Sequence, residues 1–187
     1  MLFSATDSFS AIWQTLLHEL HRGALDPKHP FRYLTVATVG EQFPQVRTVV
    51  LRHFTADLEF LVYTDARSSK VQELLEVPRV SLHFYHPKKQ VQVRVKALAT
   101  IHVEDELAQE HWKRVPDKRR SEYQSKLDPA TRIAAPAAGW ESSSDHSHFS
   151  VLKFSPLSIE VLQLAREGHL RIQYDLASGW QGVWLVP

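Results

Sequence analysis

The stretch QVQVRVKALATIHV at positions 90–103 decides the fold, because apolar and polar residues alternate over its first half. An alternation with period two places one set of side chains on each face of a β-strand. The segment RVSLHFY at 79–85 has the same character, and only the polar link 86–89 separates the two. Two such segments joined by a short link predict a pair of antiparallel strands.

Further β-type segments lie on both sides of this pair. They are YLTVATV at 33–39, QVRTVVLRH at 45–53, LEFLVYT at 58–64, and strand-like segments at 149–164, 168–174 and 180–186. Strands at such close spacing predict an antiparallel sheet or barrel rather than β-α-β units. We therefore expect a mainly β protein with short helices.

Three segments carry helical signals. Apolar residues recur every three or four positions in the N-terminal segment 7–22, which ends before Gly23. Shorter helices are expected at about 67–76, capped by Asp65, and at about 104–114, which opens with acidic residues that suit a helix N-terminus.

The chain shows neither an internal repeat nor a domain boundary, so we expect a single domain over 1–187. Residues 128–147 are poor in large aliphatic side chains and predict a long loop, followed by C-terminal strands within 149–187. Two interpretations of the loop stay open: a cover over a pocket, or a crossing without a catalytic part.

Composition excludes several classes of protein. The 22 Lys and Arg nearly balance the 21 Asp and Glu, which argues against electrostatic binding of nucleic acid. The absence of cysteine excludes disulfides, thiolate metal sites and cysteine nucleophiles. Apolar runs are too short for a membrane span, and the first twenty residues lack a signal-peptide pattern. We expect a cytoplasmic protein that binds neither nucleic acid nor membrane.

Common catalytic motifs are missing as well. The sequence has no G-x-G-x-x-G, no Walker A loop, no H-E-x-x-H and no G-x-S-x-G, and with 6 glycines a phosphate would have to be bound by side chains. The pairs His83/His86 and His146/His148 are better interpreted as solvated histidines than as metal ligands, so no metal site is expected.

Two neighbouring basic clusters are the informative feature. The first, RTVVLR at 47–52, lies in a predicted strand, and the second, YTDARSSK at 63–70, runs from a strand end into a helix start. Hydroxyl groups, free backbone N–H groups and cations at a helix N-terminus suit an anion such as a phosphate monoester. The alternative is that these are ordinary solvated residues. Arg47 and Arg52 would lie on opposite faces of an ideal strand, so a bulge or strand end is needed if they share one pocket.

The motifs R-x-V-x-L-R at 47–52, V-Y-T-D-x-x-S-S-K at 62–70 and Q-V-R-V-K-A at 92–97, followed by H-L-R-I-Q-Y at 169–174 and a closing W-x-x-x-W-L-V-P, resemble the pyridoxamine 5′-phosphate oxidase-like flavoproteins of the FMN-binding split-barrel superfamily. The resemblance extends from about Phe31 to Pro187. It implies a six-stranded antiparallel split β-barrel and a homodimer with FMN at the interface.

The resemblance also implies a set of cofactor-binding residues: Arg47, Val50, Leu51, Arg52, Tyr63, Thr64, Ser69, Lys70, Gln92 and Arg171. In this assignment Arg47 and Lys70 grip the FMN phosphate, and Gln92 reaches the flavin from the partner chain. A carboxamide offers a donor and an acceptor, which the pyrimidine edge of the flavin requires.

The chain departs from the family pattern mainly on the substrate side. His111 and Val115 stand where a tyrosine and an arginine hold the substrate phosphate, and Glu167 replaces the arginine of an Arg-x-His pair unless Arg166 serves instead. Arg52 replaces a lysine that bridges cofactor and substrate. These departures predict a substrate other than pyridoxamine phosphate, with Arg52 and His169 as candidate catalytic contacts.

Two functions therefore remain open. The first is an FMN-dependent oxidoreductase that transfers a hydride from an unidentified small molecule to the flavin. The second is a non-catalytic flavin or vitamin B6-phosphate carrier. Reduction and reoxidation of bound flavin would distinguish them.

Overall fold

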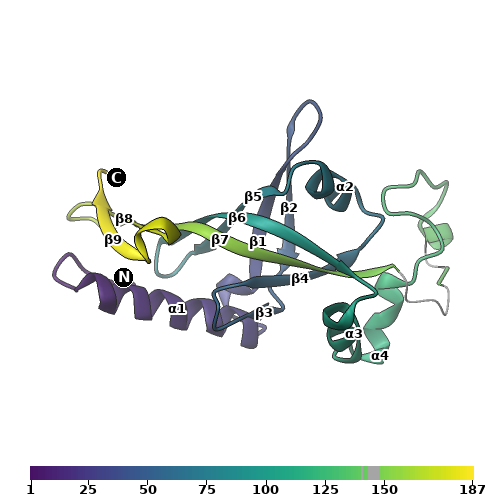
Figure 1. Ribbon diagram of the computed structural model, residues 1–187, viewed down its shortest axis with the longest axis horizontal. Coiled ribbons are helices and arrows are strands. Elements are labelled where there is room, and N and C mark those ends of the chain that lie inside the picture. Colours follow the sequence, from purple (N-terminus) through teal and green to yellow (C-terminus); the bar gives the residue numbers. More distant parts are fainter. Residues whose placement is uncertain (140, 143–147) are drawn as a thin grey trace.

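Alternating residues in the middle of the chain form the expected antiparallel sheet. The computed structural model describes residues 1–139, 141–142 and 148–187. The strands are β1 (Tyr33–Val39), β2 (Pro44–Val50), β3 (His53–Phe54), β4 (Phe60–Asp65), β5 (Arg79–His86), β6 (Val91–Val103), β7 (Phe149–Gln163), β8 (Leu170–Asp175) and β9 (Gln181–Leu185). Their order is β2-β1-β5-β6-β7-β4-β3, with β8 on β7 and β9 on β8, and the sheet is curled (Figure 1).

The mainly β, antiparallel split-barrel fold is thus confirmed, but the described residues form nine strands rather than six. The three additional strands are the two-residue β3 and the hairpin β8–β9, which extends the sheet beyond β7. The predicted segment 45–53 is interrupted at Leu51 and Arg52, because the backbone N–H of Leu51 bonds to Arg32 O and that of Arg52 to Leu61 O.

Strand β7 organises the sheet. Its first half pairs with β4 and its second half with β8, while β6 follows it along almost its whole length. An irregularity in the β6–β7 register lies between Lys96 and Ala97, close to Pro156. Proline has no N–H to donate, so a break in the ladder is expected there.

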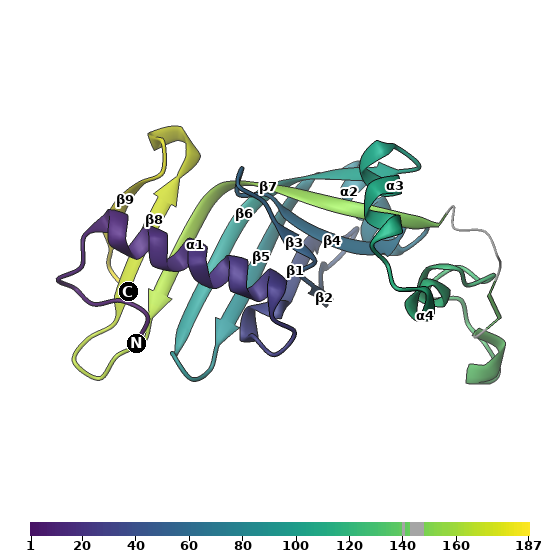
Figure 2. The same cartoon turned by 90° about the horizontal axis from the view of Figure 1, so that it is seen from below.

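The N-terminal helix α1 spans Phe9–Leu25 and lies along one side of the sheet (Figure 2). The side chain of Ser8 caps it by accepting the N–H of Ala11. The helix continues past Gly23, where the sequence predicts its end. A Cβ at Gly23 would lie 2.8 Å from the Phe31 Cβ, so this glycine permits close packing rather than ending the helix.

Three shorter helices follow: α2 (Ser69–Glu76), α3 (Glu106–Lys113) and α4 (Asp117–Arg120). Asp105 caps α3 as its acidic start suggests. Asp65, by contrast, does not cap α2, because it accepts the N–H of Arg67 at 2.8 Å and the helix begins only after Ser68. Helix α4 was not expected from the sequence.

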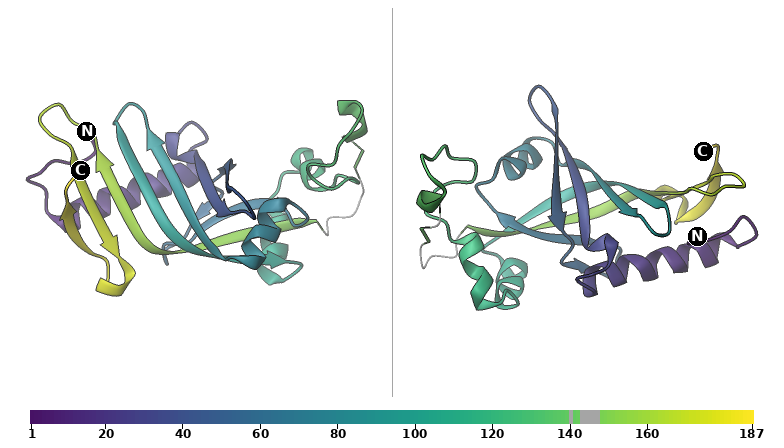
Figure 3. Two further views of the ribbon diagram at one scale, coloured as in Figure 1. Left: turned by 90° about the horizontal axis from the view of Figure 1, so that it is seen from above. Right: turned by 180° about the vertical axis from the view of Figure 1, so that it is seen from behind.

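Two apolar clusters fix these elements. The larger lies between α1 and the sheet. The smaller packs the α3–α4 segment against β4 and β7 through Leu61, Val115, Tyr123, Phe149 and Val151. Residues 117–139 extend beyond one end of the sheet (Figure 3). None of the described helices has the length and apolar character needed to cross a membrane.

Candidate functional site

Two of the predicted cations lie together at the start of α2. Lys70 is half-buried, and its Nζ donates to Thr64 Oγ1 at 2.8 Å and to Ser68 Oγ at 2.9 Å. Burial lowers the pKa of Lys70, and the nearby charge of Arg47 lowers it further. Within the described residues no ion pair joins Lys70 to a carboxylate. An ammonium group whose hydrogen-bond partners are hydroxyl groups keeps its full charge and can still bind an anion.

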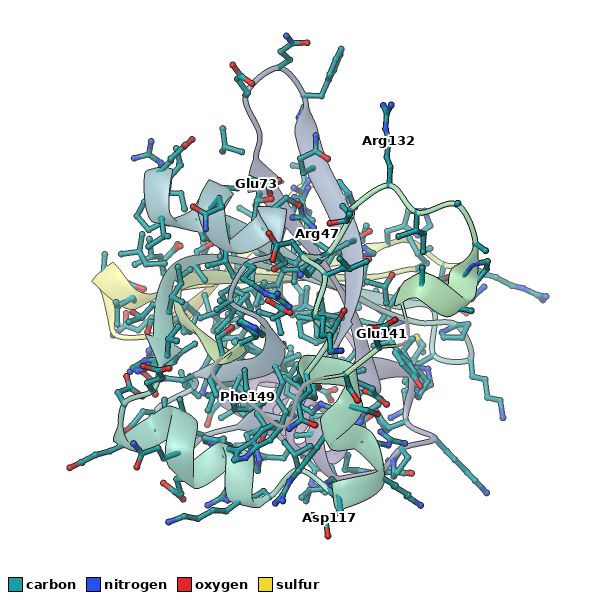
Figure 4. The ribbon with its side chains drawn as sticks, turned by 90° about the vertical axis from the view of Figure 1, so that its right-hand side faces the viewer. Arg47, Glu73, Asp117, Arg132, Glu141 and Phe149 are labelled. Carbon is teal, nitrogen blue, oxygen red and sulfur yellow. The ribbon has the colours of Figure 1, made fainter. Side chains whose placement is uncertain are left out.

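Arg47 reaches this cluster from β2 and is ion-paired. Its Nη2 lies 2.8 Å from Glu73 Oε2 on α2, and Thr38 also contacts both side chains. Figure 4 shows Arg47 and Glu73 side by side near α2. The phosphate-gripping pair predicted from the sequence is therefore brought together, with a carboxylate beside it.

Arg67 takes a different role from these two. It forms a fork with Asp65, with Nη2 2.7 Å from Oδ2, and its Nη1 lies 2.9 Å from Asp128 Oδ1. It also donates to the carbonyl of Ser125 at 2.8 Å. Arg67 thus ties the start of the long loop to the end of β4, and its guanidinium is already engaged. Arg132, further along the loop, points away from the protein (Figure 4).

The residues expected beside the flavin lie at and just after the end of β2, and on β4. Val50 ends β2, and Leu51 is fully buried. The Arg52 guanidinium lies over the Tyr63 ring, 5.3 Å from its centroid, while the Tyr63 hydroxyl lies 2.8 Å from His111 Nδ1. The hydrogen bond between Tyr63 and His111 joins β4 to α3.

Burial sets the protonation of this pair. It lowers the pKa of His111 to about 4, with His53 and Arg114 adding to the effect, and it raises the pKa of Tyr63 to about 12. His111 is therefore neutral, and one hydrogen bond joins its Nδ1 to the Tyr63 hydroxyl. Although His111 occupies a position where the family pattern has a tyrosine, it is buried behind Tyr63.

A cavity of about 350 Å³ adjoins Arg52 and Tyr63. Its lining residues come from distant parts of the chain: Ala24, Arg32, Arg52, His53, Tyr63, Arg114, Val115, Pro116, Arg119 and Tyr123. Sequence reasoning selected only Arg52 and Tyr63 as site residues here. No described residue of 128–147 lines it, so the described part of the long loop does not cover this cavity.

Gln92 and Arg171 lie on another part of the sheet. Both pair with Leu162 on β7, whereas Tyr63 pairs with Val151 on the same strand. Eleven positions of extended strand correspond to roughly 35 Å along β7. One copy of the chain therefore does not bring Gln92 and Arg171 to the cluster of Arg47 and Lys70.

Arg171 is part of an ionic triad. Glu160 accepts three hydrogen bonds from Arg94 and lies 2.9 Å from Arg171 Nη2. Arg171 Nε is buried without a hydrogen-bond acceptor. The triad lines a second cavity of about 530 Å³ on the open face of β1, β5, β6, β7 and β8. His169 is exposed in the turn between β7 and β8, where its Nδ1 accepts the N–H of Ala165 at 3.3 Å.

The buried groups Glu19, His29 and His86 form a cluster that the sequence did not indicate, with ligand atoms within 4.8 Å of one another. Both imidazoles accept a backbone N–H at Nδ1, from Phe31 and Lys89 respectively. A neutral ring must then carry its hydrogen on Nε2, which leaves no lone pair there for a metal. The Lys89 ammonium, 2.6 Å from Glu19, balances the charge instead. Of the other pair of histidines in the sequence, His146 lies outside the described residues.

The chain is similar to known proteins of one family. Residues 10–103 match the family described as pyridoxamine 5′-phosphate oxidase, FMN-binding domain. The chain is 30% identical over 170 residues to a pyridoxine/pyridoxamine 5′-phosphate oxidase of Acinetobacter baumannii, covering 87% of this chain and 71% of that protein.

Solved structures show the same fold. A pyridoxamine 5′-phosphate oxidase-related, FMN-binding protein from Nostoc punctiforme has a TM-score of 0.76 and 25% identity, covering 93% of this chain and 96% of that one. PhzG from Burkholderia lata, determined with tetrahydrophenazine-1-carboxylic acid, has a TM-score of 0.76 and 16% identity, covering 100% and 98% of the two chains.

Proposed function

Because this chain belongs to the pyridoxamine 5′-phosphate oxidase-like FMN-binding family, we propose that it binds FMN and works as an oxidoreductase on a substrate other than pyridoxamine phosphate. When bound, FMN supplies a two-electron acceptor for a hydride. The observation that carries this proposal is the half-buried Lys70 ammonium, which has hydroxyl partners, a second cation beside it and no carboxylate partner within the described chain.

The first half of the proposed cofactor site is formed by one chain. Lys70 and Arg47 bind the phosphate, supported by Ser69 at the first position of α2, where the N–H groups of Ser69 and Lys70 have no backbone acceptor in the described chain. Val50, Leu51, Tyr63 and Thr64 provide the backbone and side chains along the flavin, and the Tyr63–His111 hydrogen bond holds the tyrosine ring in one orientation.

The second half comes from another copy of the chain. Most of the length of β7 separates Gln92 and Arg171 from the phosphate cluster, which is the pair Arg47 and Lys70. A symmetric partner supplies Gln92 and Arg171 without rearrangement of the sheet. The buried Nε of Arg171, which lacks an acceptor, fits a residue that contacts a group from outside its own chain. We therefore propose a homodimer with two composite sites.

The substrate side differs from that of a pyridoxamine phosphate oxidase. The clamp positions hold His111, which is hydrogen-bonded to Tyr63, and Val115, which is apolar. Arg52 remains a substrate contact in this proposal, since its guanidinium reaches a cavity beside Tyr63. His169 is the second proposed contact, and its exposed position at the β7–β8 turn allows it to serve the partner's site.

Absorbance spectroscopy of the purified protein after incubation with FMN and dialysis tests the cofactor. We expect the wild type to keep visible flavin absorbance and Arg47→Ala to lose it. Arg79→Ala is the matched control, because Arg79 is an exposed arginine of β5. Equal retention by all three proteins, or by none, would contradict the assignment.

The same holoprotein distinguishes the enzyme from a carrier. Nicotinamide donors and amines are added without oxygen, and the loss of flavin absorbance is followed before air is admitted. Reduction by one of them followed by reoxidation supports an oxidoreductase. Flavin that binds tightly and stays oxidised with every donor supports the carrier function instead.

A further inference from the structure

The cavity beside Tyr63 gathers an unusual excess of positive charge. Arg32 from the turn before β1, Arg52 from the link between β2 and β3, and Arg119 from α4 all line it. Its volume of about 350 Å³ suits a small organic molecule. No aspartate or glutamate is among its lining residues.

These three arginines are not neutralised elsewhere in the described chain. Within the described residues no ion pair joins any of them to a carboxylate, whereas Arg114, the fourth arginine that lines the cavity, is paired with Glu110. Burial lowers the pKa of Arg32, and the charges of Arg52 and Arg119 lower it further. Crowded cations of this kind cost free energy that a bound anion would offset.

Arg52 provides a second, independent observation. Its Nε is buried and has no hydrogen-bond acceptor. The rest of its guanidinium is held in place by the Tyr123 hydroxyl at 3.4 Å and by the ring of Tyr63. A buried donor without an acceptor is costly, so its persistence beside a cavity indicates a ligand with acceptor oxygens.

The remaining walls are apolar or aromatic. Tyr63 and Tyr123 present rings on β4 and just after α4, and Val115 and Pro116 contribute apolar surface. Arg47 and Lys70 do not line the cavity, so it is separate from the proposed phosphate cluster. Cations on some walls and aromatic rings on others suit a planar organic anion.

We propose that this cavity binds the oxyanion of the substrate, a carboxylate or phosphate ester on a planar body, through Arg32, Arg52 and Arg119. The proposal deepens the proposed function and rests on it, because Arg52 and Tyr63 line the cavity and also belong to the proposed cofactor site. The charge lost at Val115 is thereby replaced by arginines from other elements.

Isothermal titration calorimetry tests this with three probes: benzoate, phenyl phosphate and the neutral benzamide. Each is titrated into the FMN-loaded protein and into the same protein freed of FMN. The variant is Arg119→Gln, since Arg119 is exposed on a short surface helix and contributes nothing to the core. Lys118→Gln is the matched control, with the same loss of charge one position away and outside the cavity.

We expect one or both anions to bind, about ten-fold or more weakly in Arg119→Gln, and within about two-fold of wild type in Lys118→Gln. The anion that binds more tightly identifies the substrate as a carboxylate or a phosphate ester. The proposal is overturned by equal effects of the two substitutions, by benzamide binding as tightly as benzoate, or by no binding of either anion.

The two protein forms separate the two possible failures. Charge-dependent binding to a protein that takes up no FMN would disprove the flavin assignment and leave the anion site standing. A protein with a normal flavin spectrum and no affinity for either anion would disprove the anion site alone.

Discussion

Arg47 and Glu73 share an ion pair of 2.8 Å at the position where we propose that the FMN phosphate binds. A phosphate at this point competes with the carboxylate for the same guanidinium. The structure therefore predicts opposite effects for substitutions of the two partners.

Removing the cations should weaken FMN binding. Arg47→Ala and Lys70→Met each lose a charge-assisted contact, which contributes about 1.5–3 kcal/mol, so the dissociation constant should rise about ten-fold or more. Glu73→Gln keeps an acceptor for Arg47 and removes the competing charge, and we expect FMN to bind a few-fold more tightly. Fluorescence quenching of FMN measures all three constants. Weaker binding to Glu73→Gln would show that the carboxylate orients Arg47 for the phosphate.

The composite site predicts complementation between two defective chains. Arg47→Ala and Arg171→Ala homodimers should both bind FMN poorly. A heterodimer of the two variants has one site with both arginines and one site with neither. When such heterodimers are purified with two different affinity tags, we expect one FMN per dimer at wild-type affinity. If no tight site is recovered, both arginines act within a single chain.

His111 should make the folded protein acid-sensitive. Burial depresses its pKa from the ordinary 6.5 to about 4, so the unfolded chain binds more protons than the folded one between these values. The free energy of unfolding should therefore fall as the pH is lowered from 6.5 to about 4. Urea titrations over this range should show a shallower fall in His111→Phe. His18→Gln, which alters an exposed histidine of α1, should keep the wild-type slope.

The stability that the buried cluster of Glu19, His29 and His86 gives to the fold should depend on Lys89. Burial raises the pKa of Glu19, but hydrogen bonds from Lys89 and His29 and the charge of Lys89 outweigh it and leave this pKa lowered, so the carboxylate is ionised. Lys89→Met leaves that charge with less compensation and should destabilise the fold by about 1–3 kcal/mol at neutral pH. Lys88→Met changes the exposed neighbouring lysine and should have little effect in the same urea titration. Equal destabilisation by both would argue against the cluster as a structural anchor.

The fold followed from the sequence because its signals are local. Alternation identified the strands, and ordered motifs identified the family. Boundaries were less accurate where a tertiary contact decides them. The sequence predicts a helix end at Gly23, yet Gly23 packs on Phe31 and lies inside α1. The predicted strand 45–53 is interrupted because the N–H groups of Leu51 and Arg52 bond to other elements.

The proximity of Arg47 and Lys70 could also be anticipated, since each belongs to a recognisable motif. The arginine-lined cavity could not. Arg32 and Arg119 lie far apart in the sequence, in segments with no motif of their own, and only the packing of the α3–α4 segment against β4 and β7 brings them together. The residues His111 and Val115 by themselves indicate only that the family's phosphate-holding tyrosine and arginine are missing from the substrate side.

The pairing of β4 with β7 has a consequence for how the chain acquires its structure. Phe60 pairs with Phe154 and Asp65 with Phe149, so β4 has no partner for its inner edge until residues 149–154 have left the ribosome. Closing so long a loop costs entropy before any contact offsets it, and non-local strand pairing slows folding. Nascent chains that end before β7 would expose unpaired edges on both β4 and β6, which makes this interval of synthesis the one most open to aggregation.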